Sequence, residues 1–435
     1  MFRLSRVTVA VVLILLALLG IALLRRSFDM VAGGQSSESS EPVEVIPATP
    51  IAQGVLEDRP GGPIIGGRPA MPAELRITRP SGITVEVVAF GIDVPWDFSW
   101  SPDGRLWVNE RPGRVRIIEK GKLKREPWLV LDDVHDDGEG GLLGQAVDPK
   151  FAAGEPWIYL AYTANVAGDK FVNRVIRVRE EAGKPGKREI LLDNLPAGIV
   201  HNGTGLTFGP DDKLYISTGD TWEKEGAQDL KYLGGKILRL NRDGSIPADN
   251  PFGPQSPVWT LGNRNPQGMA FDPFNGNMWA TEHGPSGEWT GVGQYDEVNH
   301  IERGKNYGWP LIIGAAGKPD YVDPVLCFPE HGLPPNGIVI YSGRGIREWK
   351  GNLFFCSLRG GTLVRVVLDD STRTHPVRVE RLFEHSFTHG QFGRLRALGE
   401  GPDGYLYFGT TNRDGRGKHD PENDRIFRIL PAGKK

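Results

Sequence analysis

The stretch LTFGPDDKLYIST (residues 206–218) decides the fold, because it contains two short apolar strands joined by a tight turn. Proline and aspartate favour the backbone angles that such turns need, so the stretch predicts a β-hairpin. Five related phrases occur elsewhere, each with a comparable turn and an aromatic residue in the second strand: FSWSPDGRLWVNE (98–110), AVDPKFAAGEPWIYLAYT (146–163), MAFDPFNGNMWATEH (269–283), IVIYSGRGIREWKGNLFFCS (338–357) and ALGEGPDGYLYFGTT (397–411).

The hairpins recur at intervals of roughly 50–70 residues, which is room for a four-stranded sheet and a loop. Helical periodicity is almost absent beyond the N-terminus. The sequence therefore predicts an all-β fold, a six-bladed β-propeller over residues 76–435. Ring closure needs one strand from each end of this domain, and GITVEVVAFG (82–91) and DRIFRIL (424–430) are the candidates.

The charge balance excludes one class of partner. The 435 residues carry a formal net charge of -3, with a pI near 6.3. Lysine and arginine are scattered along the chain rather than gathered into a basic run, so nucleic-acid binding is not expected.

The N-terminus has a different composition from the rest of the chain. An uncharged apolar run over residues 7–24 is flanked by arginines, and it is longer than the apolar region of most signal peptides. It predicts a signal anchor, a transmembrane segment over residues 1–26, although cleavage stays open. The Ser-, Pro- and Gly-rich residues 27–75 are expected to form a disordered tether. Cys327 and Cys356 are compatible with one disulfide or with two buried thiols.

Several polar residues precede the hairpins at equivalent places. His201, Arg264 and Arg394 lie just upstream of the third, fourth and sixth hairpins. Because the loops at one end of a propeller converge on its axis, we expect these side chains to face one shared space.

Six ordered motifs resemble the soluble quinoprotein glucose/sorbosone dehydrogenases, especially the bacterial aldose sugar dehydrogenases, over most of the chain after about residue 80. They are EGGLLGQAVDPKF (139–151), HNGTGLTFGPDDKLYISTGD (201–220), LGGKILRLNRDGSIPADNPF (233–252), GNRNPQGMAFDP (262–273), EHGP to YDEVNHIERGKNYGWP (282–310) and GRLRALGEGPDGYLY (393–407).

The resemblance implies an enzyme that oxidises an aldose to its lactone with pyrroloquinoline quinone (PQQ) and Ca²⁺. His201 would be the general base that takes the proton of the sugar hydroxyl, and Asp220 would orient it. Arg264 and Asn265 would lie over the quinone and stabilise the negative charge that develops there. Outside this motif context, each would be as easily explained as a structural loop residue.

The resemblance also assigns residues to the cofactors. Arg359, Arg394 and Arg396 would bind the quinone carboxylates, which guanidinium groups match well. The backbone carbonyls of Gly284 and Pro285 would bind calcium. Glu139 stands where the family usually has a glutamine contacting the cofactor, and a carboxylate there would repel the carboxylates of the quinone unless it is protonated or turned away. Either Glu139 has another partner or the pocket is altered.

Two other functions stay open. One is a calcium-dependent lactonase, which would need carboxylate and asparagine side chains around a metal. The other is a propeller that binds a partner without a cofactor. Trp96, Trp222 and Trp309 could stack on a sugar, but tryptophans of propellers more often pack between blades, so none is assigned to the site. The protein is expected in the periplasm, anchored to the inner membrane or secreted if the anchor is cleaved, and to pass electrons to an unidentified acceptor.

Overall fold

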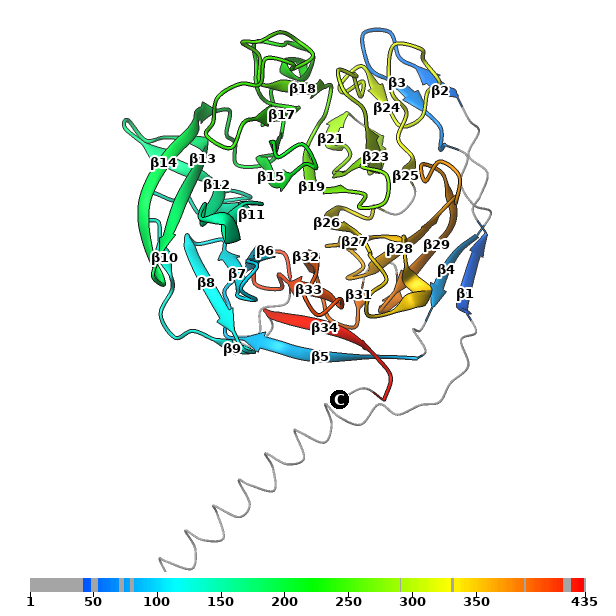
Figure 1. Ribbon diagram of the computed structural model, residues 1–435. Helices are drawn as coiled ribbons and strands as arrows, with labels where there is room; N and C mark the ends of the chain where they lie inside the picture. The colour runs from blue at the N-terminus through cyan, green and yellow to red at the C-terminus, as the bar shows by residue number, and fades with distance from the viewer. Residues whose placement is uncertain are drawn as a thin grey trace, which may run out of the picture. The chain divides into compact units, whose positions relative to one another are not determined.

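Six antiparallel sheets surround a central axis in the computed structural model (Figure 1). The structure describes residues 42–47, 54–69, 74–78, 82–289, 291–329, 332–386, 389–417 and 424–433. Each sheet contains a run of four strands, and the innermost strands contact one another around the whole ring. The all-β class is therefore confirmed, and the six sheets are arranged as the blades of a propeller.

The blades follow one another along the chain, each running from the axis outward. They are β6 (Pro95–Trp100), β7 (Leu106–Glu110), β8 (Arg114–Glu119) and β10 (Leu129–Val130); β11 (Leu142–Val147), β12 (Trp157–Val166), β13 (Lys170–Glu181) and β14 (Lys184–Leu195); β15 (Gly203–Phe208), β16 (Leu214–Thr218), β17 (Lys236–Leu240) and β18 (Val258–Leu261); β19 (Pro266–Phe271), β20 (Met278–Glu282), β23 (Asp296–Ile301) and β25 (Leu326–Phe328); β26 (Pro335–Ile340), β27 (Leu353–Ser357), β28 (Leu363–Leu368) and β29 (Pro376–Leu382); and β32 (Leu395–Glu400), β33 (Leu406–Thr410), β34 (Arg425–Pro431) and β5 (Ile83–Phe90).

Each predicted hairpin forms the two inner strands of one blade. The second strand of the hairpin packs between neighbouring sheets on both of its faces, so its residues are buried without alternation, as in β7, β16 and β33. Trp107 and Trp279 on such strands are completely buried. These aromatic residues therefore fill the space between blades.

The last blade is closed by both ends of the domain. β34 pairs with β5 in antiparallel register, with Ile429 opposite Val85. The predicted pairing of residues 82–91 with 424–430 is confirmed. Closure removes the exposed edge that an open ring of blades would have.

The segment predicted to be a disordered tether contains strands in its described parts. β2 (Val55–Asp58) and β3 (Ile64–Gly66) form a hairpin, and β3 pairs in parallel with β24 (Ile312–Ile313). β1 (Pro42–Pro47) pairs with β4 (Glu74–Thr78), which extends the fifth blade from β29. The tether prediction is wrong for these residues, because they pair with one another and, through β3 and β4, with the distant strands β24 and β29.

The predicted membrane anchor over residues 1–26 lies outside the described residues. No helix in the described part of the chain is long and apolar enough to span a bilayer.

Cys327 and Cys356 are both buried free thiols, so the disulfide alternative is not realised. Burial raises the pKa of each thiol above its ordinary value.

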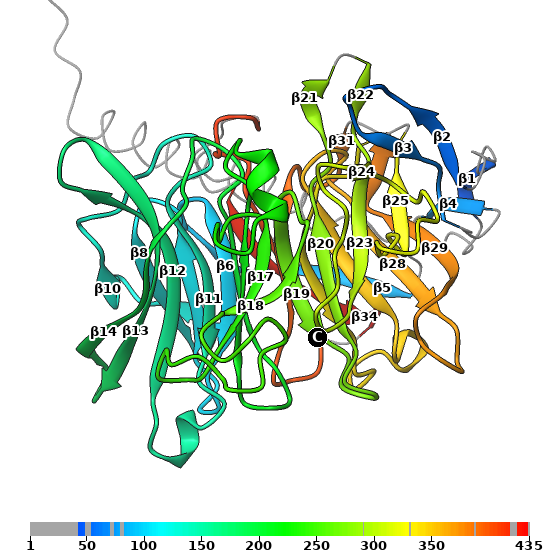
Figure 2. The ribbon, with the colours of Figure 1, turned by 90° about the horizontal axis from the view of Figure 1, so that it is seen from above.

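The two ends of the propeller differ in structure. In the view turned by 90° from Figure 1, β21 (Ser286–Trp289), β22 (Val292–Gly293), β24 and β3 lie together at one end (Figure 2).

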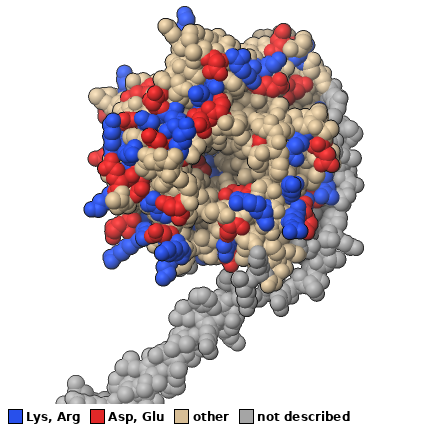
Figure 3. Space-filling model, in the orientation of Figure 1, with Lys and Arg blue, Asp and Glu red and all other residues tan. Residues whose placement is uncertain are grey.

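On the face shown in Figure 3, basic and acidic residues are interspersed around a central hollow. The described residues on this face form no continuous basic surface of the kind that binds nucleic acid.

Candidate active site

Three predicted site residues form one hydrogen-bonded chain. His201 Nδ1 lies 2.7 Å from Asp220 Oδ1, and His201 Nε2 lies 2.8 Å from Arg264 Nη2. Because arginine can only donate, Nε2 must accept this bond, and Nδ1 therefore carries the proton that it donates to Asp220. All three side chains are buried. The Nε2 lone pair of the imidazole therefore accepts from Arg264, and the Asp220 carboxylate lies at the other ring nitrogen, Nδ1.

The hairpins explain how these residues meet. His201 precedes β15, Asp220 follows β16, and Arg264 precedes β19 in the next blade. The backbone N–H of Asp220 donates to the Arg264 carbonyl over 2.7 Å, which joins the two blades at this point. The predicted meeting of His201 and Arg264 is therefore observed, and it follows from their equivalent places in adjacent blades.

Arg264 is fixed by partners that the sequence did not reveal. Its Nη2 lies 2.5 Å from Glu288 Oε1, and both side chains are only 3% exposed. Its Nη1 donates to the His283 carbonyl over 3.0 Å. A buried ion pair with such geometry restricts the guanidinium to one position. Glu288 follows the EHGP motif closely, and that proximity was the only signal in the sequence.

Trp309 holds the carboxylate of Asp220. Its indole Nε1 donates to Asp220 Oδ2 over 2.8 Å, and its ring lies 5.5 Å from the Arg264 guanidinium carbon. Trp309 therefore contacts both partners of His201. The sequence placed Trp309 among the candidate sugar-stacking residues, and in the structure it is a buried residue that orients the site.

Trp222 lies on the exposed side of His201. The two rings are 5.2 Å apart and nearly parallel, and Trp222 is 53% exposed. Its backbone N–H donates to Asp220 Oδ1, so the same carboxylate orients both rings. Thr221 and Trp222 both have positive φ, a backbone conformation that persists only where surrounding contacts impose it.

Glu139 has partners other than a cofactor. Its Oε2 accepts the backbone N–H of His201 over 3.0 Å, and its Oε1 lies 3.4 Å from Arg416. The carboxylate is thereby turned toward the His201 backbone and paired with a cation. The sequence left open whether the Glu139 carboxylate has another partner, and in the structure both of its oxygens have one.

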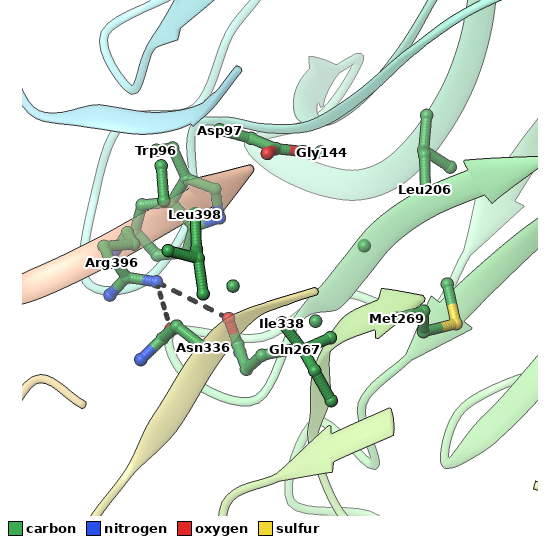
Figure 4. Close-up of a pocket in the computed structure, with 14 residues that line it drawn as sticks. Trp96, Asp97, Gly144, Leu206, Gln267, Met269, Asn336, Ile338, Arg396 and Leu398 are labelled. Carbon is green, nitrogen blue, oxygen red and sulfur yellow. Dashed lines mark hydrogen bonds between the residues drawn. The ribbon is translucent and has the colours of Figure 1, made fainter. Parts of the chain in front are cut away.

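Gln267 connects Asn265 to Arg396. Asn265 Oδ1 accepts the N–H of Gly203 and the amide of Gln267, whereas its buried Nδ2 has no partner among the described residues. Arg396 donates to Asn336 over 2.8 Å and more weakly to Gln267, and its guanidinium lies 3.4 Å above the Trp96 ring (Figure 4).

A cavity of about 80 Å³ on the axis is lined by Trp96, Gln267, Asn336 and Arg396, together with other residues of all six innermost strands; His201 and Asn265 are not among its lining residues. Burial lowers the pKa of Arg396 to about 9, so its guanidinium remains charged at neutral pH. Its buried Nε has no partner in the described part of the chain. The axial cavity therefore contains a cation with unused hydrogen-bonding capacity.

The sequence of the domain matches the glucose/sorbosone dehydrogenase family over residues 92–419. The chain belongs to this family. A putative oxidoreductase (glucose dehydrogenase) from Thermus thermophilus is 41% identical, with a TM-score of 0.72 over 80% of this chain and 100% of that one. The PQQ-bound aldose sugar dehydrogenase of Streptomyces coelicolor is 32% identical, with a TM-score of 0.69 over 81% and 99%. Aldose sugar dehydrogenase YliI of Escherichia coli is 30% identical over 77% of this chain and 92% of its own.

The remaining residues predicted from the glucose/sorbosone dehydrogenase resemblance lie in different surroundings. Arg394 forms an ion pair with Asp414 over 2.8 Å, so its guanidinium is already matched to a carboxylate. Arg359 is exposed. Neither residue is as deeply enclosed as Arg396, although all three were predicted to bind one cofactor.

Gly284 and Pro285, the predicted calcium ligands in this dehydrogenase family, are buried between β20 and β21. The Pro285 carbonyl accepts the N–H of Gln294 over 2.8 Å, and the Gly284 carbonyl accepts the hydroxyl of Ser286 over 3.4 Å. Each carbonyl oxygen has a second lone pair. A Cβ on Gly284 would lie 1.8 Å from the Gln294 carbonyl, so only glycine fits this turn.

Two carboxyl groups lie opposite each other on β20 and β23, next to the backbone of Arg264. Glu282 on β20 accepts the backbone N–H of Arg264, and it faces Glu297 across the β20–β23 ladder. Asn299 donates to both carboxyl groups over 3.3 Å. Burial raises the pKa of both groups, and most strongly that of Glu297. Through the Glu282 carboxylate, this pair holds the backbone N–H of Arg264 in place.

Proposed function

We propose that this protein is a PQQ-dependent aldose sugar dehydrogenase that oxidises an aldose to its lactone, with His201 as the general base and calcium as a Lewis acid. The observation that carries the proposal is the chain Asp220–His201–Arg264, in which Nε2 of a buried imidazole accepts a hydrogen bond. The names of the PQQ-bound and aldose-oxidising relatives supply the cofactor and the substrate class.

The residues present fit an anionic planar cofactor. The buried Nδ2 of Asn265 and Nε of Arg396 are donors without partners among the described residues, and Arg396 is charged. Charge-assisted hydrogen bonds to carboxylates are the interaction that such donors favour. Glu139, which would have repelled a carboxylate, is directed to the His201 backbone and paired with Arg416.

A bound PQQ would supply the hydride acceptor, and calcium on the carbonyls of Gly284 and Pro285 would polarise its reactive carbonyl. The role of His201 is to remove the proton of the C1 hydroxyl through Nε2. Arg264 donates to that same atom, so an incoming hydroxyl must take the place of this hydrogen bond. The remaining contacts of Arg264 with Glu288 and His283 hold the guanidinium beside the reacting atoms.

Asp220 and Trp309 support the proton transfer. As Nε2 gains a proton, the imidazole becomes positively charged, and the Asp220 carboxylate at Nδ1 stabilises that charge. The Trp309 indole donates to the other carboxylate oxygen and keeps the carboxylate directed at His201 Nδ1. Both groups therefore favour the product of proton abstraction.

The cellular setting extends this proposal. The apolar run over residues 7–24 supports an anchored protein whose propeller faces the periplasm, where it would deliver electrons to an acceptor of unknown identity.

The test is dye-linked oxidation of a panel of aldoses by the full chain, with and without added PQQ and Ca²⁺. We expect activity only when both are present, and a loss of at least ~10²-fold in kcat for His201→Ala. Equal activity without PQQ, or in the variant, would overturn the proposal. PQQ binding without any sugar oxidation would refute the substrate class alone.

A further inference from the structure

The N-terminal hairpin β2–β3 packs against the loops that form the site. β3 pairs in parallel with β24, with Ile64 opposite Ile312 and Ile65 opposite Ile313. The N–H of Ile64 donates to the Leu311 carbonyl over 2.9 Å, and Gly67 exchanges hydrogen bonds with Ala315. Both ribbon views show β3 beside β24 (Figures 1 and 2). This hairpin precedes the region that matches the family, residues 92–419.

Ile65 on β3 completes a hydrophobic cluster around Trp309. The buried members are Ile65, Ala227, Val292, Trp309 and Ile313, with Trp289 and Tyr295 packed against them. Ile65 is 5% exposed and Trp309 is 4% exposed. The Trp289 ring packs edge-on against Trp309 at 5.2 Å. The indole is therefore enclosed by side chains from several loops and from the N-terminal hairpin.

The fit between the hairpin and the loops is close. A Cβ on Gly66 would lie 2.4 Å from the Ala315 carbonyl carbon, so only glycine lets β3 approach the backbone near β24. This approach places the neighbouring Ile65 in the Trp309 cluster. β2, in contrast, is exposed along its whole length, and Leu56 is 44% exposed.

We infer that β3 is a positioning element for the active site and that Ile65 is its positioning residue. It acts through Trp309, whose indole binds Asp220 Oδ2 and whose ring lies beside the Arg264 guanidinium. Removing the side chain of Ile65 frees the indole to shift, and with it the two groups that hold His201. This inference rests on the proposed function for its kinetic consequence, but the change in hydrogen bonding at Asp220 occurs without any cofactor.

The experiment compares Ile65→Ala with Leu56→Ala in the full chain. The second variant removes an aliphatic side chain of the same size from the same hairpin but does not reach the cluster. The first measurement is the NMR signal of the Trp309 Nε1–H and its exchange with water in the protein without PQQ. We expect faster exchange in Ile65→Ala and an unchanged signal in Leu56→Ala.

The second measurement is steady-state aldose oxidation by the reconstituted proteins. We expect Ile65→Ala to lower kcat roughly tenfold with little change in KM, since small displacements of catalytic groups are costly. Ile65→Val should restore most of the rate. If Ile65→Ala fails to fold, the exchange rate of the indole N–H is compared between Ile65→Val and wild type, where a small increase is expected and no increase would overturn the inference. An indole signal and a kcat equal to those of Leu56→Ala would overturn the inference.

The two measurements separate the two proposals. An inactive wild-type protein would refute the proposed function, while the indole signal would still decide whether β3 positions Trp309. A changed indole signal with an unchanged kcat would show that Trp309 moves without consequence for His201, and this result also contradicts the inference.

Discussion

His201 adopts a left-handed backbone conformation with φ of 58°, which is unusual for a residue other than glycine. Such a conformation persists where the surroundings impose it, and it is frequent at functional sites. The Glu139 carboxylate accepts the His201 N–H and is one of the contacts that impose it. Glu139 therefore helps to fix the backbone geometry of His201.

This role predicts different results for two replacements of Glu139. Glu139→Gln keeps an oxygen that accepts from the His201 N–H, so we expect kcat within about threefold of wild type. Glu139→Ala leaves that N–H without its acceptor, and we expect a loss of roughly tenfold in kcat. Steady-state kinetics at saturating PQQ measures both. Equal rates for the two variants would contradict the positioning role.

Asp220→Asn tests the pairing of carboxylate and imidazole. The amide nitrogen can only donate, and it carries no charge to stabilise a protonated imidazole, so we expect kcat to fall by roughly 10²- to 10⁴-fold. Circular dichroism should show an intact fold. Asp320→Asn, on an exposed residue, is the control. A rate within tenfold of wild type in Asp220→Asn would remove Asp220 from the mechanism.

Lys236 on β17 orders the loop that follows Asp220. It is completely buried, and its Nζ donates to the carbonyls of Gly226, Ala227 and Gly234, each over 2.9 Å. Burial lowers the pKa of this ammonium group from 10.5 to about 7. The unfolded chain therefore binds more protons than the folded chain between these values, so Lys236 makes the protein more stable as the pH rises from about 7 toward 10.

At pH 7, Lys236→Met is expected to cost about 3 kcal/mol, because three carbonyls lose their donor. It should also remove the increase in stability between about pH 7 and 10 that Lys236 contributes. Thermal unfolding of both proteins over this range measures the difference. Lys187→Met, at a lysine that is 67% exposed, is the control. A constant difference between wild type and Lys236→Met at all pH values would contradict the titration.

The β5–β34 pair closes the ring, and its buried side chains should be essential to stability. Ile429 is completely buried. We expect Ile429→Ala to lower the free energy of unfolding by about 2–5 kcal/mol. Val87→Ala, on the partner strand and 40% exposed, should cost less than about 1 kcal/mol. Urea unfolding measures both, and similar costs would argue against closure by this pair.

The whole propeller was predictable from the sequence because its signals are local. Each blade begins with a turn and a hairpin that are continuous in the chain, as in residues 206–218. The strands of residues 55–66 were not predictable, since their partner edge at Ile312 is remote and their composition is rich in glycine and proline. The equally distant pairing of β5 with β34 was predictable because ring closure needs one strand from each end of the domain, whereas no such requirement specifies a partner for β3.

The sequence predicted some residues of the candidate site and missed others. His201, Asp220 and Arg264 were predictable because motifs carry them, and the structure places them in contact. Glu288 and the contact of Trp309 with Asp220 were not, because they act through side-chain contacts between loops. Tertiary contacts of this kind determine the protonated nitrogen of His201, which no sequence pattern specifies.

The decisive measurement is the rate at which aldose reduces PQQ bound to the full chain, followed by stopped-flow absorbance in wild type and His201→Ala. If His201 is the base, both proteins bind PQQ with similar affinity, and the variant reduces it at least ~10²-fold more slowly. Reduction at the same rate in both proteins would show that the proton leaves by another route, and the chain Asp220–His201–Arg264 would then have only a structural role.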